Sequence, residues 1–183
     1  MKFVDRVIQG WRIRKVRPYV PPGSRVLDVG CAGSALYDAV PGIGQYVGID
    51  PHLAASSERG GARFIKGWFP QDLPPLAPFD VITMLAVLEH LPPDVQPRVV
   101  QSCADLLRAG GQVVLTVPSP FVDHILTVLR FARLVDADAF TIDQHHGFDV
   151  RRTADLFGVS GFMLVAWKRF ELGLNNLFVF RKT

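Results

Sequence analysis

Short apolar-rich runs recur along the chain, separated by polar, glycine and proline turns. They occupy residues 26–29, 46–49, 62–66, 79–84 and 112–117. Runs of about four to eight such residues bounded by turn signals are typical of strands buried on both faces of a parallel sheet. The pattern therefore predicts five parallel strands in one buried sheet.

Apolar residues at helical spacing predict helices between these strands. The first helix lies within residues 1–20 and ends before Pro18, because the residue before a proline is disfavoured in a helix. Asp94 is expected to cap a later helix, since its carboxylate accepts hydrogen bonds from free backbone N–H groups. Further helices are predicted at residues 36–40, 53–59, 94–108 and 150–157, and residues 119–140 form an amphipathic helical insert.

The C-terminal end has the pattern of a β-hairpin. Apolar-rich segments at residues 161–168 and 176–180 flank a turn at Gly173-Leu174-Asn175. Together with the five parallel strands, they give a sheet of seven. A chain of 183 residues that is 49% hydrophobic can cover such a sheet with helices on both faces, so we expect one α/β domain over residues 1–183.

Composition narrows the class of protein. No apolar run approaches the ~20 residues that span a bilayer, so we expect no membrane span. The two cysteines, Cys31 and Cys103, do not have the pattern of a disulfide framework, which fits a reducing compartment. We therefore expect a soluble, cytoplasmic protein.

Charge is concentrated at the N-terminus. Residues 1–17 carry six Lys or Arg against one Asp, a net charge of +5, so the total of +3 leaves −2 for the rest of the chain. We interpret this segment as a helix that packs across the sheet edge with a solvated cationic face. The alternative is a surface for nucleic acid, anionic lipid or an acidic substrate.

The first strand ends at a glycine turn, Gly30-Cys31-Ala32-Gly33, which leads into a helix. Glycine lets the backbone approach a ligand, and the free N–H groups of the helix point outward there. Asp50 ends the second strand 20 positions after Gly30, where a carboxylate can accept hydrogen bonds from both hydroxyls of a ribose. The arrangement predicts a nucleoside-containing cofactor. Ala32 and Ala35 stand where a dinucleotide fingerprint has glycine, which disfavours NAD.

Two segments carry a family resemblance. Val26-Leu27-Asp28-Val29-Gly30-Cys31 resembles motif I of the class I S-adenosylmethionine-dependent methyltransferases, of the small type 11/12-like kind. Residues 79–92, which end in Leu-Glu-His-Leu-Pro, resemble a second signature of the same family. The resemblance implies a three-layer Rossmann-like fold with a mostly parallel seven-stranded sheet, an antiparallel last strand and S-adenosylmethionine as cofactor. We expect residues 119–140 to pack on the sheet; the alternative, which the resemblance implies, is a lid over the acceptor or a dimer surface.

The cofactor contacts follow from the resemblance and from the strand ends. Asp28 is expected to organise the loop and the methionine amino group, and Asp50 to bind the ribose. Relatives often have Gly-Asp after the third strand where this chain has Gly67-Trp68, so Trp68 either walls the adenine or packs in the core. The expected cofactor-binding residues are Asp28, Gly30, Cys31, Gly33, Asp50, Pro51, Gly67, Trp68, Met84 and Leu85.

Three histidines are candidates for the general base that an O–H or N–H acceptor needs, because imidazole titrates near neutrality. They are His90, His145 and His146; the alternative for each is a loop histidine bonded to a backbone carbonyl. Some relatives hold a divalent ion with a Glu-x-x-Glu-His cluster, but Ala86 stands at the first glutamate position here. We therefore predict no metal.

Methyl transfer to an O, N or C atom of a small-molecule acceptor is the function that these residues predict, in a monomer or a homodimer. An RNA methyltransferase is an alternative that only the basic N-terminus supports. A protein that binds S-adenosylmethionine without turnover is the other alternative.

Overall fold

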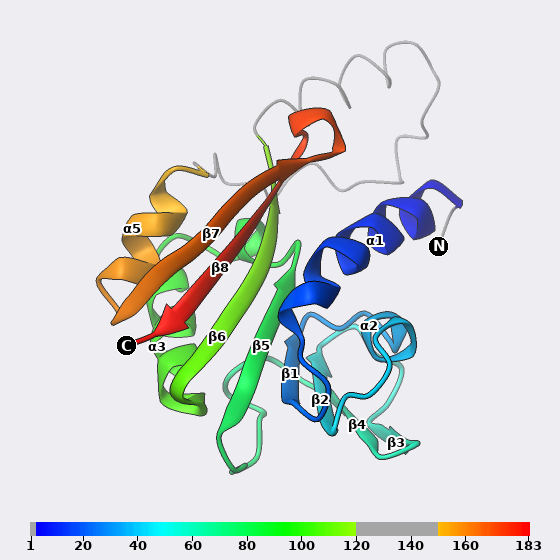
Figure 1. Cartoon of the computed structure of the whole chain (residues 1–183). Helices are drawn as coiled ribbons and strands as arrows, with labels where there is room; N and C mark the ends of the chain where they lie inside the picture. The colour runs from blue at the N-terminus through cyan, green and yellow to red at the C-terminus, as the bar shows by residue number, and fades with distance from the viewer. Residues whose placement is uncertain (1–2, 120–149) are drawn as a thin grey trace.

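The computed structural model describes residues 3–119 and 150–183 (Figure 1). A single sheet runs through the molecule, and helices lie on both of its faces. The elements are α1 (Phe3–Val16), η1 (Arg17–Tyr19), β1 (Arg25–Val29), α2 (Ala35–Ala39), β2 (Gln45–Asp50), β3 (Ser57–Arg59), β4 (Ala62–Lys66), β5 (Phe79–Leu85), η2 (Leu88–His90), α3 (Gln96–Leu106), β6 (Leu107–Pro118), α5 (Arg152–Gly158), β7 (Phe162–Phe170), η4 (Glu171–Gly173) and β8 (Asn175–Lys182).

The strands are ordered β3-β4-β2-β1-β5-β6-β8-β7. The five from β4 to β6 are parallel to one another, as the apolar runs predicted. Strand β8 inserts antiparallel between β6 and β7, which confirms the C-terminal hairpin. Strands β2 and β4 lie on one side of β1, and β5 and β6 lie on the other. A crevice opens at the carboxyl end of β1, where the strand order reverses and open α/β sheets bind ligands.

Two apolar cores lie on the two faces of the sheet. Helices α3 and α5 contribute Val99, Cys103 and Phe157 to one core, and α1 and α2 contribute Ile13 and Leu36 to the other. The last strand also fastens α3, because Lys182 Nζ donates hydrogen bonds to Ala104 O (2.7 Å) and Leu107 O (2.8 Å). A cation at these carbonyls satisfies groups that a helix end leaves unpaired.

The sheet has eight strands, not the predicted seven, because the predicted helix at 53–59 is wrong. Its C-terminal half is β3, which pairs antiparallel with β4 across Gly60-Gly61. Both glycines have positive φ, +57° and +84°. Two-residue hairpin turns with positive φ at both positions match the twist of the flanking strands, so the glycine pair selects a hairpin.

The helix predicted at 94–108 is shorter, and Asp94 does not cap it. Val95 occupies the N-cap position without a side-chain hydrogen bond. The helix ends at Leu106, and β6 begins at Leu107, five residues earlier than expected. The helical insert predicted at residues 119–140 lies outside the described residues, except for Ser119. None of the described helices is long and apolar enough to cross a membrane.

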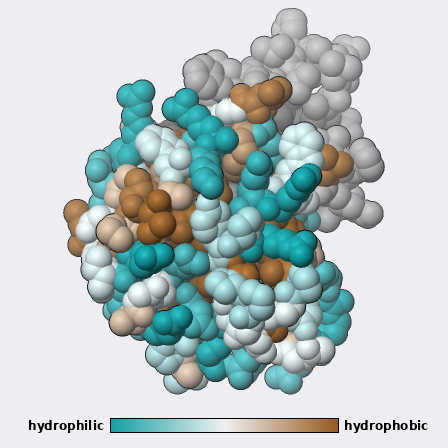
Figure 2. Space-filling model, viewed as in Figure 1, coloured by the Kyte–Doolittle hydropathy of each residue, from teal (hydrophilic) through white to brown (hydrophobic). Residues whose placement is uncertain are grey.

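The edge strand β7 exposes a small group of apolar side chains. Met163, Leu164 and Val165 are each about half exposed, and hydrophobic side chains gather over β7 in Figure 2. The pairing register with β8 shifts between Leu164 and Ala166. An irregularity of this kind twists an edge and hinders pairing with another chain.

Candidate functional site

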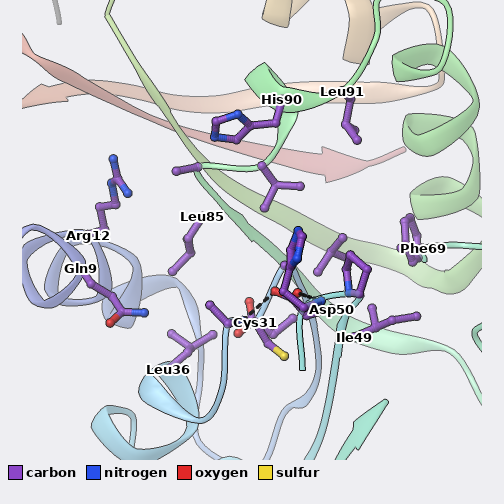
Figure 3. Close-up of a pocket in the computed structure, with 18 of the residues that line it drawn as sticks. Gln9, Arg12, Cys31, Leu36, Ile49, Asp50, Phe69, Leu85, His90 and Leu91 are labelled. Atoms are coloured by element: carbon purple, nitrogen blue, oxygen red, sulfur yellow. Dashed lines mark hydrogen bonds between the residues drawn. The ribbon is translucent and has the colours of Figure 1, made fainter. Parts of the chain in front are cut away.

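A cavity of about 590 Å³ opens at the carboxyl ends of β1, β2 and β5 (Figure 3). Its wall is built by the inner face of α1, the loop after β1, the end of β2, residues 68–69 and the segment after β5. These are the strand ends at which the sequence predicted the cofactor. The volume is that of a pocket for a small organic ligand.

Asp28 is the acidic residue of β1 and lies at the floor of the cavity. It is buried, and its two carboxylate oxygens each accept one hydroxyl hydrogen bond, from Tyr46 (2.7 Å) and from Thr83 (2.6 Å). Burial raises the pKa of Asp28 to about 6; the two hydrogen bonds lower it and the nearby Asp50 raises it. Asp28 is therefore a carboxylate that changes charge close to neutral pH.

The loop after β1 has a tightly fixed path. Gly30 has φ +72° and donates its N–H to Ile49 O (2.9 Å). A Cβ at this position would lie 2.4 Å from Val87 Cγ2, so only glycine fits. Ala32 has φ +46°, an unfavourable conformation for alanine, and its N–H donates to Asp50 Oδ2 (2.9 Å). The backbone is thus bare at Gly30, where the loop borders the cavity.

Asp50 connects the loop after β1 with the end of β2. Its carboxylate accepts from Ala32 N and, through Oδ1, from His52 N (2.7 Å), and it lines the cavity beside Pro51. Each oxygen keeps a second lone pair for another donor. Asp50 can therefore hold the loop and still accept hydrogen bonds from a ligand.

Cys31 lines the cavity and packs against β2. Burial raises the pKa of its thiol to about 12, so the side chain is neutral and acts as a small apolar group. A Cβ at Gly48 would lie 2.8 Å from Cys31 Sγ, which explains why the adjoining strand has glycine there.

Trp68 and Leu85 also line the cavity. Trp68 is 63% exposed, so the alternative, packing in the core, is wrong. The structure does not bring three other predicted residues to this wall. Gly33 and Gly67 lie outside the cavity lining, and Met84 is fully buried in the core beneath it.

The described residues include only one of the three candidate histidines. His90 follows β5 in η2 and lines the cavity across from α1 (Figure 3). His145 and His146 lie outside the described residues, so their role stays a prediction. Within residues 3–119 and 150–183, no three side chains of His, Cys, Asp or Glu gather as metal ligands would.

The inner face of α1 is the part of the site that sequence reasoning does not reveal. Gln9, Arg12 and Ile13 line the cavity, although the pattern favours a basic outer helix. Their spacing of three and four residues places them on one helix face, which is the signal that the sequence offers. Burial lowers the pKa of Arg12, while Glu89 and Glu171 raise it.

Glu89 lies in η2 and interacts electrostatically with Arg12. It is 1% exposed, and its Oε2 has no hydrogen-bond partner among the described residues. Burial raises the pKa of Glu89 to about 7, and the charge of Arg12 lowers it. The carboxyl group is therefore partly protonated at neutral pH.

The variant Glu89→Gln should be more stable than the native chain at pH 8, by on the order of 1 kcal/mol, and similar to it at pH 5. The folded pKa lies above the unfolded value of 4.5, so stability falls as the pH rises from about 4.5 through 7 and the carboxylate becomes charged. Glutamine carries no charge and escapes this loss. Urea denaturation at both pH values measures the difference in stability between the variant and the native chain, with exposed Glu58→Gln as the control. A difference that is equal at the two pH values would contradict the assignment.

Comparison with known proteins supports what the geometry indicates. The sequence matches the profile of the methyltransferase domain over residues 3–164. It is 31% identical over 150 residues to the ubiquinone biosynthesis O-methyltransferase of Xanthomonas axonopodis pv. citri, which covers 74% of this chain and 60% of that protein. The protein of the same name from Thiobacillus denitrificans is 35% identical over 116 residues, 56% of this chain and 48% of its own length. The chain thus spans about half to three fifths of these relatives.

Solved structures have the same fold. Magnesium protoporphyrin IX methyltransferase from Synechocystis PCC 6803, with bound S-adenosylhomocysteine, has a TM-score of 0.69 at 16% identity over 100% of this chain and 88% of its own. The 1,6-didemethyltoxoflavin-N1-methyltransferase of Burkholderia thailandensis has a TM-score of 0.66 at 19% identity, over 94% of this chain and 78% of its own. Together with the profile match over most of its length, this places the chain in the methyltransferase domain family, with the class I methyltransferase fold.

Proposed function

We propose that the protein is an S-adenosylmethionine-dependent methyltransferase that acts on an O, N or C nucleophile of a small-molecule acceptor. The observation that carries the proposal is the pairing of Asp50, which has free lone pairs at the cavity, with the bare backbone of Gly30 beside it. An adenosyl group needs both features, one for its ribose and one for close approach.

We assign each part of the cofactor to residues that line the cavity. Asp50 would accept hydrogen bonds from the ribose hydroxyls, with Trp68 beside the adenine. Asp28 would receive the methionine ammonium. The buried Nε of Arg12, which has no hydrogen-bond partner in the described part of the chain, offers a cation for the methionine carboxylate. S-adenosylmethionine supplies an electrophilic methyl group on a sulfonium.

The chain's own tasks are to align the acceptor, exclude water and accept one proton. Apolar side chains after β5, those of Val87 and Leu91, line the wall near His90 and keep water from that end. We propose His90, His145 and His146 as the candidates that take the proton from an O–H or N–H acceptor. The names of the relatives, an O-methyltransferase and an N-methyltransferase of small molecules, favour this acceptor class.

We further propose a cytoplasmic location and a monomer or homodimer. Both cysteines are free and buried, which fits a reducing compartment. The exposed cations of α1 and η1, Arg14, Lys15 and Arg17, would serve a nucleic acid if the acceptor were RNA instead.

Release of S-adenosylhomocysteine from S-adenosylmethionine tests the function, with pools of phenols, amines, carboxylic acids and RNA as acceptors. Turnover with a small molecule that changes little between 50 and 300 mM salt supports the proposal. Turnover with RNA alone, falling steeply with salt, would replace it with the RNA alternative. Tight cofactor binding without turnover in any pool would favour a non-catalytic protein.

A further inference from the structure

The Asp28 carboxylate is unusual because it is held from two neighbouring strands at once. We propose that Tyr46 on β2 and Thr83 on β5 are positioning residues that keep this carboxylate ionised and aimed at the cavity, where it receives the cofactor ammonium. The inference rests on the proposed function and deepens it, since it assigns roles to two residues that do not line the cavity themselves.

The geometry leaves Asp28 little freedom. Tyr46 OH donates to Oδ2 at 2.7 Å and Thr83 Oγ1 donates to Oδ1 at 2.6 Å. Both donors are buried, Tyr46 at 1% and Thr83 at 0% exposure, and β1 lies between their two strands. One hydrogen bond from each side fixes the plane of the carboxylate and leaves one lone pair on each oxygen for a ligand.

The charges around Asp28 show why it needs these donors. Desolvation raises its pKa, and Asp50 at the end of β2 raises it further. Cys31 is a neutral thiol and brings no positive charge, and Arg12 on α1, at the same cavity wall, interacts with two glutamates instead. The two hydroxyl groups are thus the local interactions that favour the charged form.

Removing either hydroxyl should therefore raise the pKa of Asp28 and weaken cofactor binding below neutral pH. In a plot of affinity for S-adenosylhomocysteine against pH, the acid limb is the range in which affinity falls as the pH is lowered. We expect Tyr46→Phe and Thr83→Val each to move this limb to higher pH by roughly one to two units. The dissociation constant at pH 7 should rise about 2- to 10-fold. The gap to the native chain should narrow toward pH 8, which a merely structural defect would not produce.

The chain offers a matched control for each variant. The Tyr37 ring lies 5.2 Å from that of Tyr46, but its hydroxyl donates to Gly60 O and not to Asp28, so Tyr37→Phe should leave the profile unchanged. Thr116 is as buried as Thr83, and its hydroxyl has no partner within residues 3–119 and 150–183, so Thr116→Val should also be silent.

Calorimetric titration from pH 5 to 8 with S-adenosylhomocysteine makes the measurement, and 5′-methylthioadenosine, which lacks the amino group, serves as a second ligand. An acid limb that moves for S-adenosylhomocysteine in both variants and is absent for 5′-methylthioadenosine supports the proposal. An unmoved limb in either folded variant overturns it and leaves the proposed function standing. A native chain that binds neither ligand overturns both. Urea denaturation confirms that each variant is folded.

Discussion

Asp50→Ala is expected to weaken S-adenosylmethionine binding by roughly 1.5–3 kcal/mol, which is about 10- to 150-fold, since hydrogen bonds to a charged group contribute on this scale. The carboxylate lies at the cavity with its inner lone pairs used by Ala32 N and His52 N. Alanine removes the acceptor for the ribose hydroxyls. It also releases Ala32 from a conformation, φ +46°, that its side chain disfavours, so the loop loses its path.

Calorimetric titration with S-adenosylmethionine measures the effect. Asp38→Ala is the matched control, because Asp38 is an exposed aspartate of α2 that pairs with Arg59 away from the cavity. The control should bind as the native chain does. Native affinity in folded Asp50→Ala protein would refute the ribose assignment.

Gly30→Ala should cost roughly 2–4 kcal/mol of the free energy of unfolding. Two penalties add: alanine is strained at φ +72°, and its Cβ would lie 2.4 Å from Val87 Cγ2. Val87 cannot easily turn away, because a β-branched side chain has few rotamers. Removing this close contact therefore requires movement of the loop after β1 or of the segment after β5, and both form the cavity wall.

Two other glycines separate these penalties in urea denaturation. Gly110 has φ +72°, the same as Gly30, but a Cβ placed there would meet open space, so Gly110→Ala should cost only about 1–2 kcal/mol. Gly10 lies in α1 with open space and no positive φ, so Gly10→Ala should stabilise by up to about 1 kcal/mol. If Gly30→Ala is no worse than Gly110→Ala, the close contact with Val87 does not exist.

Much of the fold could be predicted because buried parallel strands leave a strong apolar signal. The strand within 53–59 escapes prediction because a three-residue edge strand carries little apolar pattern. Its signal is the Gly60-Gly61 pair, which indicates a hairpin. The N-cap at Asp94 fails because Val95 already has helical dihedrals, so the helix begins without a side-chain cap.

The place of the cavity could be predicted from the strand ends, and Asp28 and Asp50 both line it. Met84 and Leu85 illustrate the limit: successive strand residues face opposite sides, and the sequence alone does not show which of them reaches the cavity. The inward face of α1 escapes prediction for another reason. Its arginines look alike in sequence, and only the packing of Ile13 shows that Arg12 turns toward the cavity.

The most direct test of the account is calorimetric titration of the native chain with S-adenosylhomocysteine and, separately, with a nicotinamide dinucleotide. We predict saturable one-to-one binding of S-adenosylhomocysteine and no heat of binding from the dinucleotide. A folded protein that binds the dinucleotide and ignores S-adenosylhomocysteine would contradict the account.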